Sequence, residues 1–82
     1  MKIYDFNGKK NICGERIHEA RTRQRLPQAD LAARLQIAGV IIEHDSVSRI
    51  EIGTRFVADY ELMILADVLS VSVDWLLGIE KD

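Results

Sequence analysis

The sequence has few of the residues that make disulfides, chain breaks or membrane spans. Its 82 residues include one cysteine and one proline, and aromatic residues make up 6%. The lone Cys13 excludes an intramolecular disulfide and a cysteine-ligated metal site, which fits the reducing cytoplasm. The uncharged stretch at residues 36–42 is far too short to cross a bilayer, and residues 1–11 lack the apolar core of a signal peptide. We expect a soluble cytoplasmic protein with no membrane contact.

The chain also lacks the patterns that accompany catalysis. It contains no glycine-rich phosphate loop, no paired catalytic carboxylates and no metal-ligand spacing. Cys13 has no matched histidine or aspartate and is expected to be a small buried apolar residue rather than a nucleophile. A chain of this length can bury one small core. We therefore predict a single domain that is not an enzyme and that needs no cofactor or metal.

Charge is divided unevenly along the chain, although the formal net charge is only −2. Residues 1–55 carry ten Lys and Arg against seven Asp and Glu, a net +3, while residues 56–82 carry one against six, a net −5. The first part can therefore offer a local basic face to phosphates. The acidic last part should weaken nonspecific long-range attraction to a polyanion.

Apolar residues recur with a helical period over most of the chain. In residues 11–26 they fall one turn apart, at Cys13, Ile17 and Ala20. Pro27 suits the first position of the next helix, where a main-chain N–H has no partner within the helix. These patterns predict the first two helices.

Glycines and N-cap residues mark the remaining helices. Gly39 is expected to end the second helix, and a third runs over residues 44–52 until Gly53. Asp59 is a candidate N-cap for a fourth helix and Ser72 for a fifth. Five short helices without a strong strand pattern predict an all-α domain.

The domain is expected to span residues 11–79. Residues 1–10 alternate apolar and polar side chains before "NGKKN", so they predict an extended arm or a short edge strand that ends in a turn. Residues 80–82 are assigned to a C-terminal tail.

Three stretches, "GERIHEARTRQRLPQADLAARL", "VSRIEIGTR" and "VSVDWLLG", occur in this order over residues 14–78. Together they resemble the Xre family of bacterial and phage transcriptional regulators, whose domain is like the heads of the lambda and 434 repressors. The resemblance implies a five-helix lambda-repressor-like domain in which the second and third helices form a helix-turn-helix. It also implies that the third helix enters the major groove of double-stranded DNA, and that the protein acts as a homodimer, as a repressor.

The resemblance assigns site residues by position. Base reading is expected from side chains that can donate to or accept from base edges, at His44, Asp45, Ser46 and Arg49. Phosphate contact is expected from the start of the second helix, from the third helix and from the following loop, at Gln28, Ser48 and Arg55. Arg21 and Glu51 match a family pair that forms an internal salt bridge, so a structural role is expected for both.

The chain departs from the family in the turn between the second and third helices. This turn is enlarged, with an apolar link at residues 40–42. We expect the extra residues to extend the second helix by about one turn, and Val40, Ile41 and Ile42 to pack against the bundle, because burial of apolar surface contributes about 25 cal/mol per Å².

Some positions keep a structural alternative to a functional role. Asp45 could equally be a first-turn acid that stabilises the helix dipole. His18 is expected to be a solvated surface residue, and Trp75 can either fill the core or contribute to a dimer contact. An alternative function for the whole domain is an antitoxin or adaptor, in which residues 40–42 or the C-terminal apolar residues hold a protein partner.

Overall fold

Five α-helices follow one another in the computed structural model, which describes residues 5–79 except for the side chain of His44. They are α1 (Gly14–Arg23), α2 (Gln28–Ile37), α3 (His44–Ile52), α4 (Asp59–Leu69) and α5 (Val73–Leu76). Within the described residues there is no strand, so the all-α prediction is confirmed. The first four residues of the predicted arm and the predicted tail at 80–82 lie outside the described part.

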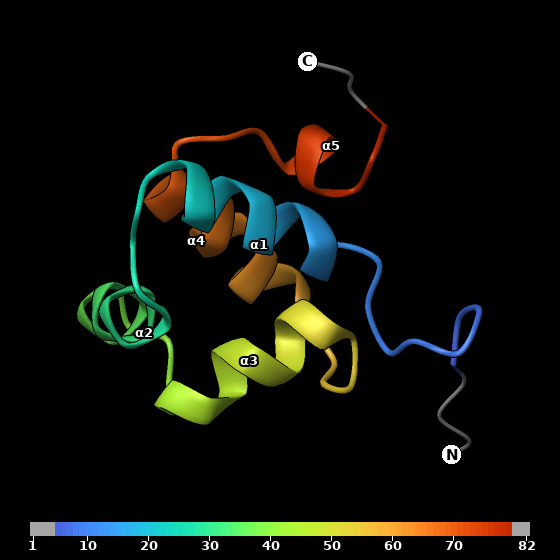
Figure 1. Ribbon diagram of the computed structural model, residues 1–82, viewed down its shortest axis with the longest axis horizontal. Coiled ribbons are helices and arrows are strands. Elements are labelled where there is room, and N and C mark those ends of the chain that lie inside the picture. The colour runs from blue at the N-terminus through green and yellow to red at the C-terminus, as the bar shows by residue number, and fades with distance from the viewer. Residues whose placement is uncertain (1–4, 80–82) are drawn as a thin grey trace.

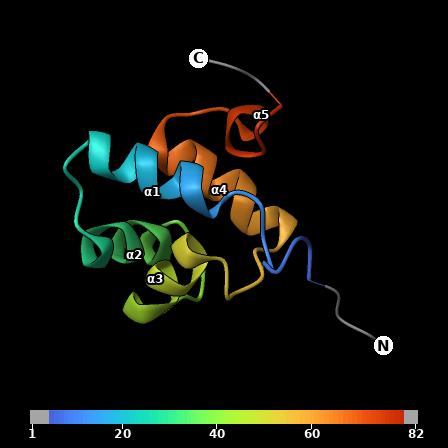
Figure 2. The same ribbon diagram turned by 45° about the vertical axis from the view of Figure 1, so that its right-hand side comes forward.

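The five helices pack around one another (Figure 1), and each contributes side chains to a single core. In Figure 2, α1 lies across α4, α2 and α3 lie together below them, and the short α5 lies at the opposite side. The largest fully buried side chains come from every helix: Ile17, Leu31, Leu35, Val47, Ile50, Leu65, Leu69 and Leu76. The apolar spacing noted in the sequence therefore faces this core.

The N-terminal end of α1 lies close against the C-terminal half of α3. A Cβ at Gly14 would lie 2.2 Å from the Ile50 carbonyl oxygen, so only glycine allows this approach. Asn11 joins the same two elements: its Oδ1 accepts from the Gly14 N–H at 2.8 Å, and its Nδ2 donates to the carbonyls of Ile50 at 3.0 Å and Arg55 at 2.8 Å. The position of α3 is thus set by direct contact with α1.

A tight hairpin precedes this junction. Phe6 and Lys9 exchange two main-chain hydrogen bonds, of 2.7 and 3.0 Å, around Asn7 and Gly8. Both of these turn residues have positive φ, 52° and 80°, as a two-residue hairpin turn requires. The Lys10 N–H then donates to the Gly53 carbonyl at 2.8 Å, which attaches the hairpin to the end of α3.

The enlarged turn between α2 and α3 begins with a glycine-terminated helix end. Gly39 has φ +98°, its N–H donates to the Gln36 carbonyl, and the Val40 N–H donates to the Leu35 carbonyl. This pair of bonds is a Schellman motif, which satisfies carbonyls that the helix leaves open. The predicted stop at Gly39 is therefore confirmed, although α2 itself ends at Ile37.

The apolar link is only partly packed. Val40 and Ile42 are 3% and 5% exposed, as expected, but Ile41 is 97% exposed, so the prediction of its burial was wrong. The link is non-helical, and Val40 and Ile42 belong to the core while Ile41 between them faces solvent. The Gln36 amide donates to the Ile42 carbonyl at 2.7 Å and ties the link to α2.

The last two helices begin almost where expected. Asp59 is the first residue of α4 rather than its N-cap, which is Ala58, and the Glu61 carboxylate accepts from the Ala58 N–H at 2.9 Å. Ser72 does cap α5, accepting from the Trp75 N–H at 2.9 Å. Trp75 is 5% exposed and belongs to the core, which agrees with the first of its two interpretations.

Candidate nucleic-acid interface

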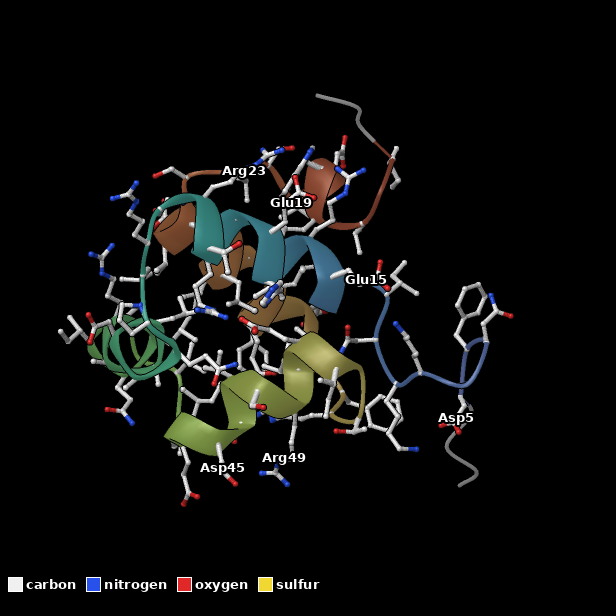
Figure 3. All side chains as sticks on the ribbon, viewed as in Figure 1. Asp5, Glu15, Glu19, Arg23, Asp45 and Arg49 are labelled. Carbon is white, nitrogen blue, oxygen red and sulfur yellow. The ribbon has the colours of Figure 1, made fainter. Side chains whose placement is uncertain are left out.

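One face of α3 is exposed and charged. Asp45 and Arg49 project from the same side of α3, away from the bundle (Figure 3), with side chains 64% and 53% exposed. They lie one turn apart and form an ion pair of 3.5 Å. Ile52, the next residue on this face, is also exposed. This face offers a carboxylate and a guanidinium to a partner.

The side of α3 that packs against the bundle includes one residue that was expected to read bases. Ser46 is 6% exposed, so it is not available to a base in this structure. It lies on the helical face that also carries the buried Val47 and Ile50, and its Oγ accepts from Arg49 Nη2 at 3.5 Å. Ser48 is half-buried. The sequence analysis expected Ser46 to face a base, whereas its place in the helical period turns it toward the interior.

His44 is the first residue of α3, as the resemblance implied. Only its main chain is described. The expected base-reading role of its side chain therefore stays a prediction.

Gln28 begins α2 and is half-buried. Pro27 immediately before it acts as the N-cap with an extended backbone, so Pro27 lies one residue outside the helix rather than inside it. As a first-turn residue, Gln28 has a main-chain N–H for which the helix supplies no acceptor. Its side chain is committed elsewhere: Nε2 donates to Glu51 Oε1 at 3.1 Å.

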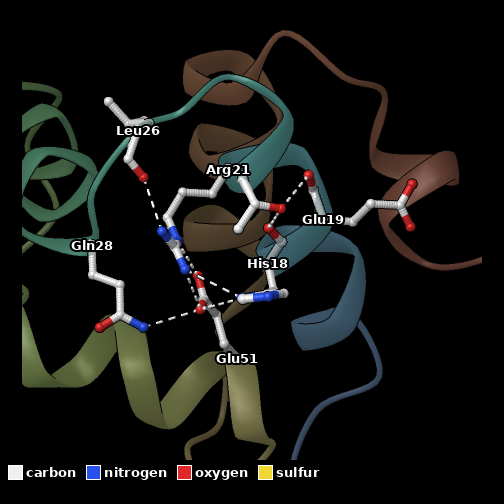
Figure 4. A network of polar contacts seen from close by, with 7 residues as sticks. His18, Glu19, Arg21, Leu26, Gln28 and Glu51 are labelled. Atoms are coloured by element: carbon white, nitrogen blue, oxygen red, sulfur yellow. Dashed lines mark hydrogen bonds and ion pairs between the residues drawn. The ribbon is translucent and has the colours of Figure 1, made fainter.

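Glu51 is the centre of a polar cluster between α1, α2 and α3 (Figure 4). Arg21 and Glu51, the pair expected from the resemblance, lie together: Arg21 Nε donates to Glu51 Oε2 at 2.6 Å and Arg21 Nη2 to Oε1 at 3.0 Å. Arg21 Nη1 also donates to the Leu26 carbonyl at 2.9 Å. His18 Nδ1 lies 2.9 Å from Glu51 Oε1. One buried carboxylate thus connects three helices.

Both members of the pair are held in their charged forms. Burial acts to raise the pKa of Glu51, but the hydrogen bonds from Arg21, His18 and Gln28 outweigh burial and lower that pKa below its ordinary value. The hydrogen bond to Glu51 raises the pKa of Arg21. The cluster is therefore a buried ion pair with two further polar contacts.

Sequence reasoning missed His18 as a member of this cluster. It assigned His18 to solvent, and the imidazole is indeed 56% exposed, but one ring nitrogen contacts the buried Glu51 carboxylate. A signal was present, because His18 precedes Arg21 by three residues and so shares its helical face. The pairing of Gln28 with Glu51 had no comparable sequence signal.

Arg55, expected to hold a phosphate, has an internal partner. Its Nη1 and Nη2 donate to the two oxygens of Glu61, each at 3.1 Å, and Nη1 donates also to the Phe56 carbonyl. The hydrogen bond from Arg55 lowers the pKa of Glu61, against the opposing effect of burial. The guanidinium is thus fixed in place, with part of its charge neutralised by Glu61.

A shallow groove with a basic lining lies beside the end of α3. Its lining combines three cationic side chains with a hydroxyl and an aromatic ring: Lys10, Arg49, Thr54, Arg55 and Phe56. The Lys10 ammonium lies 5.3 Å from the centre of the Phe56 ring, and it also pairs with Asp5 at 2.7 Å. The groove therefore joins the N-terminal hairpin, α3 and the following loop in one basic surface.

Comparison with known proteins establishes the fold. The arrangement of α1 to α5 is that of a lambda-repressor-like helix-turn-helix domain. The structure is similar to that of the P22 c2 repressor protein, solved in complex with a synthetic operator in the presence of Tl⁺, with a TM-score of 0.71, 24% sequence identity, and coverage of 85% of this chain and 98% of that chain. No family model and no curated protein matches the sequence.

In residues 5–79, no helix is long and apolar enough to span a membrane. The same residues contain no group of three or more His, Cys, Asp or Glu side chains placed to hold a metal ion. Cys13 is buried, and burial raises the pKa of its thiol to about 11.

Proposed function

We propose that the chain is a sequence-specific regulator of transcription that binds double-stranded DNA, acts as a repressor and reads the major groove with α3. The observation that carries this proposal is the exposed, charged face of α3, with Asp45 and Arg49 beside the basic groove. The structural neighbour, a repressor solved with an operator, supports it. A homodimer would match a two-fold operator, since each α3 then reads one half-site.

The roles divide between reading and positioning. Arg49 and, from the start of α3, His44 donate to guanine, while Asp45 accepts from cytosine. Gln28 contacts a phosphate through the main-chain N–H at the start of α2, where the helix dipole favours an anion. Ser48, and the basic groove beside the end of α3 that includes Arg55, hold further phosphates.

The direct test is a fluorescence-anisotropy titration against duplexes tiled from the region upstream of the protein's own gene, repeated at several salt concentrations. The proposal expects saturable binding to one fragment that persists against competitor DNA and weakens steeply as salt rises. Equal binding to all fragments and to an unrelated duplex would remove the claim of sequence specificity.

Replacement of Arg49 by alanine tests the reading helix. On the bound fragment, Arg49→Ala should cost about 1–3 kcal/mol and relax base preference at one position. Because the Asp45–Arg49 pair is exposed, its loss should change stability by only about 0.3–0.5 kcal/mol. The matched control, Arg34→Ala, removes the same charge from an exposed position on α2 and should leave base preference unchanged. Equal effects of the two variants would count against Arg49.

A protein partner is a second candidate function, favoured by one observation. Ile37 and Ile41 are 87% and 97% exposed at the α2–α3 turn. In this alternative, an antitoxin or adaptor would bury these two side chains against another protein. Co-purification of a stoichiometric partner from the native host, lost on Ile41→Asp, would support this function in place of DNA reading.

A further inference from the structure

His18 makes a polar contact that the proposed function has not used. Glu51 Oε1 lies within hydrogen-bonding distance of three side chains: His18 Nδ1 at 2.9 Å, Arg21 Nη2 at 3.0 Å and Gln28 Nε2 at 3.1 Å (Figure 4). Arg21 also donates to the other oxygen, Oε2, so Oε1 is the oxygen that the three side chains share. The two remaining contacts link α1 and the start of α2 through that one oxygen.

The distances indicate which ring nitrogen of His18 carries the proton. Nδ1 lies 2.9 Å from the Glu51 carboxylate and 3.2 Å from Arg21 Nη2. A single nitrogen cannot donate to the first and accept from the second. The contact with the buried anion is the shorter one, and an unprotonated Nδ1 would set two lone pairs against each other there. Nδ1–H therefore donates to Glu51.

The side chains of this chain of contacts, His18, Glu51 and Gln28, differ in burial. The Glu51 side chain is 5% exposed, whereas that of His18 is 56% exposed. Gln28 is half-buried at the first turn of α2, where the proposed phosphate contact is made. His18 and Arg21 both hold Oε1, to which the Gln28 amide donates. This chain of contacts joins α1 to the first turn of α2 through a side chain of α3.

We propose that His18 is a positioning residue for DNA binding: by donating to Glu51 Oε1, it holds Gln28 and the start of α2 in the orientation that meets a phosphate. This inference rests on the proposed function. His18 touches no DNA in it and acts through Glu51 and Gln28. His18→Asn should preserve the effect, because an asparagine amide can place a donor near the position of Nδ1, whereas His18→Gln places its amide near the position of Nε2.

The first experiment needs no DNA. In ¹H–¹⁵N spectra of the full chain, the side-chain amide signals of Gln28 should move on His18→Ala and His18→Gln and stay near their wild-type positions on His18→Asn. Glu15→Ala, a change at an exposed position of α1 whose carboxylate pairs with Lys9, is the control and should not move them. Unchanged Gln28 signals in His18→Ala would overturn the inference.

The second experiment measures affinity for a duplex retained by the wild-type protein from a random-sequence library. His18→Ala and His18→Gln should each weaken binding about three- to tenfold, the equivalent of one net hydrogen bond, and His18→Asn should restore it. In a Gln28→Ala background, His18→Ala should change affinity less than about twofold, since coupled residues are non-additive. A purely structural role for His18 would give the same loss in both backgrounds and would overturn the inference.

The two experiments distinguish a failure of the proposed function from a failure of the positioning role of His18. If wild-type protein retains no duplex although the Gln28 signals respond to His18→Ala, then the proposed function fails, and the role in DNA binding fails with it, while the contact stands. If the wild-type protein binds one duplex and His18→Ala binds it equally well, then DNA binding stands and the positioning role of His18 fails.

Discussion

Two Arg–Glu pairs of the same chemistry lie in different settings in this molecule. Arg21 and Glu51 join α1 to α3 across 30 residues of sequence, while Arg55 and Glu61 join a loop to the first turn of α4 across only six. Both carboxylates are buried, and each guanidinium group donates two hydrogen bonds to its carboxylate. The arginines differ in that the Arg21 side chain is 11% exposed and that of Arg55 is 25% exposed.

The difference in setting implies a difference in role. Glu51 accepts from side chains of two other helices, so its loss removes contacts that orient three helices at once. Glu61 accepts from Arg55 and from the main chain of Ala58, and so fixes one loop and one helix start. The first pair sets the arrangement of the helix-turn-helix, while the second sets the loop that follows it.

The largest expected effect is therefore that of Glu51→Gln. It leaves the nearly buried Arg21 without a counter-charge, and breaking a buried pair in this way costs about 3–5 kcal/mol of unfolding free energy. Urea denaturation at pH 7 measures this loss. Glu15→Gln, the same change at a side chain 83% exposed, is the control and should cost less than about 0.5 kcal/mol. Similar losses in both variants would show that Glu51 does not hold the three helices together.

A smaller effect is expected for Glu61→Gln. This change removes the charge from two hydrogen bonds with Arg55. Because Arg55 is more exposed than Arg21 and can recover contacts with water, we expect a loss of about 1.5–3 kcal/mol of unfolding free energy. The same denaturation series gives the value. If Glu61→Gln destabilised the chain more than Glu51→Gln, the ranking drawn from burial and connectivity would be reversed.

These pairs also show how far sequence can predict the structure. The helices, their glycine stops and the Ser72 cap follow from local periodicity and turn chemistry, because each depends on residues within one or two turns. The pairing of Arg21 with Glu51 was expected only through a family resemblance, since the residues are far apart in sequence. The partner of Arg55 was missed, because it depends on how a loop folds back onto a helix start.

The expected site shows the same limit. Helical spacing places Asp45 and Arg49 on one exposed face, as anticipated, but it was not applied to Ser46, which lies one residue along and is buried. In the enlarged turn, composition predicted burial for all of residues 40–42. The backbone there is non-helical, and Ile41 is exposed while its two neighbours are buried. Amino-acid composition gives no information on the direction in which each of these side chains points.

The smallest expected effect is a change in acid sensitivity. The pKa of Glu51 and that of Glu61 are both lower in the folded chain than the ordinary value of 4.5. The unfolded chain therefore binds more protons between that value and the folded pKa. The stability that each carboxylate contributes is fully present above pH 4.5 and is lost as the pH falls through the folded pKa.

Each Glu→Gln variant, measured by urea denaturation at pH 7, 5, 4 and 3, should lose less stability than the wild type over this range. The double variant should show the sum of the two reductions if the pairs are independent. A variant whose loss with falling pH parallels that of the wild type would show that the replaced carboxylate has the same pKa in both states, and that its hydrogen bonds only offset its burial.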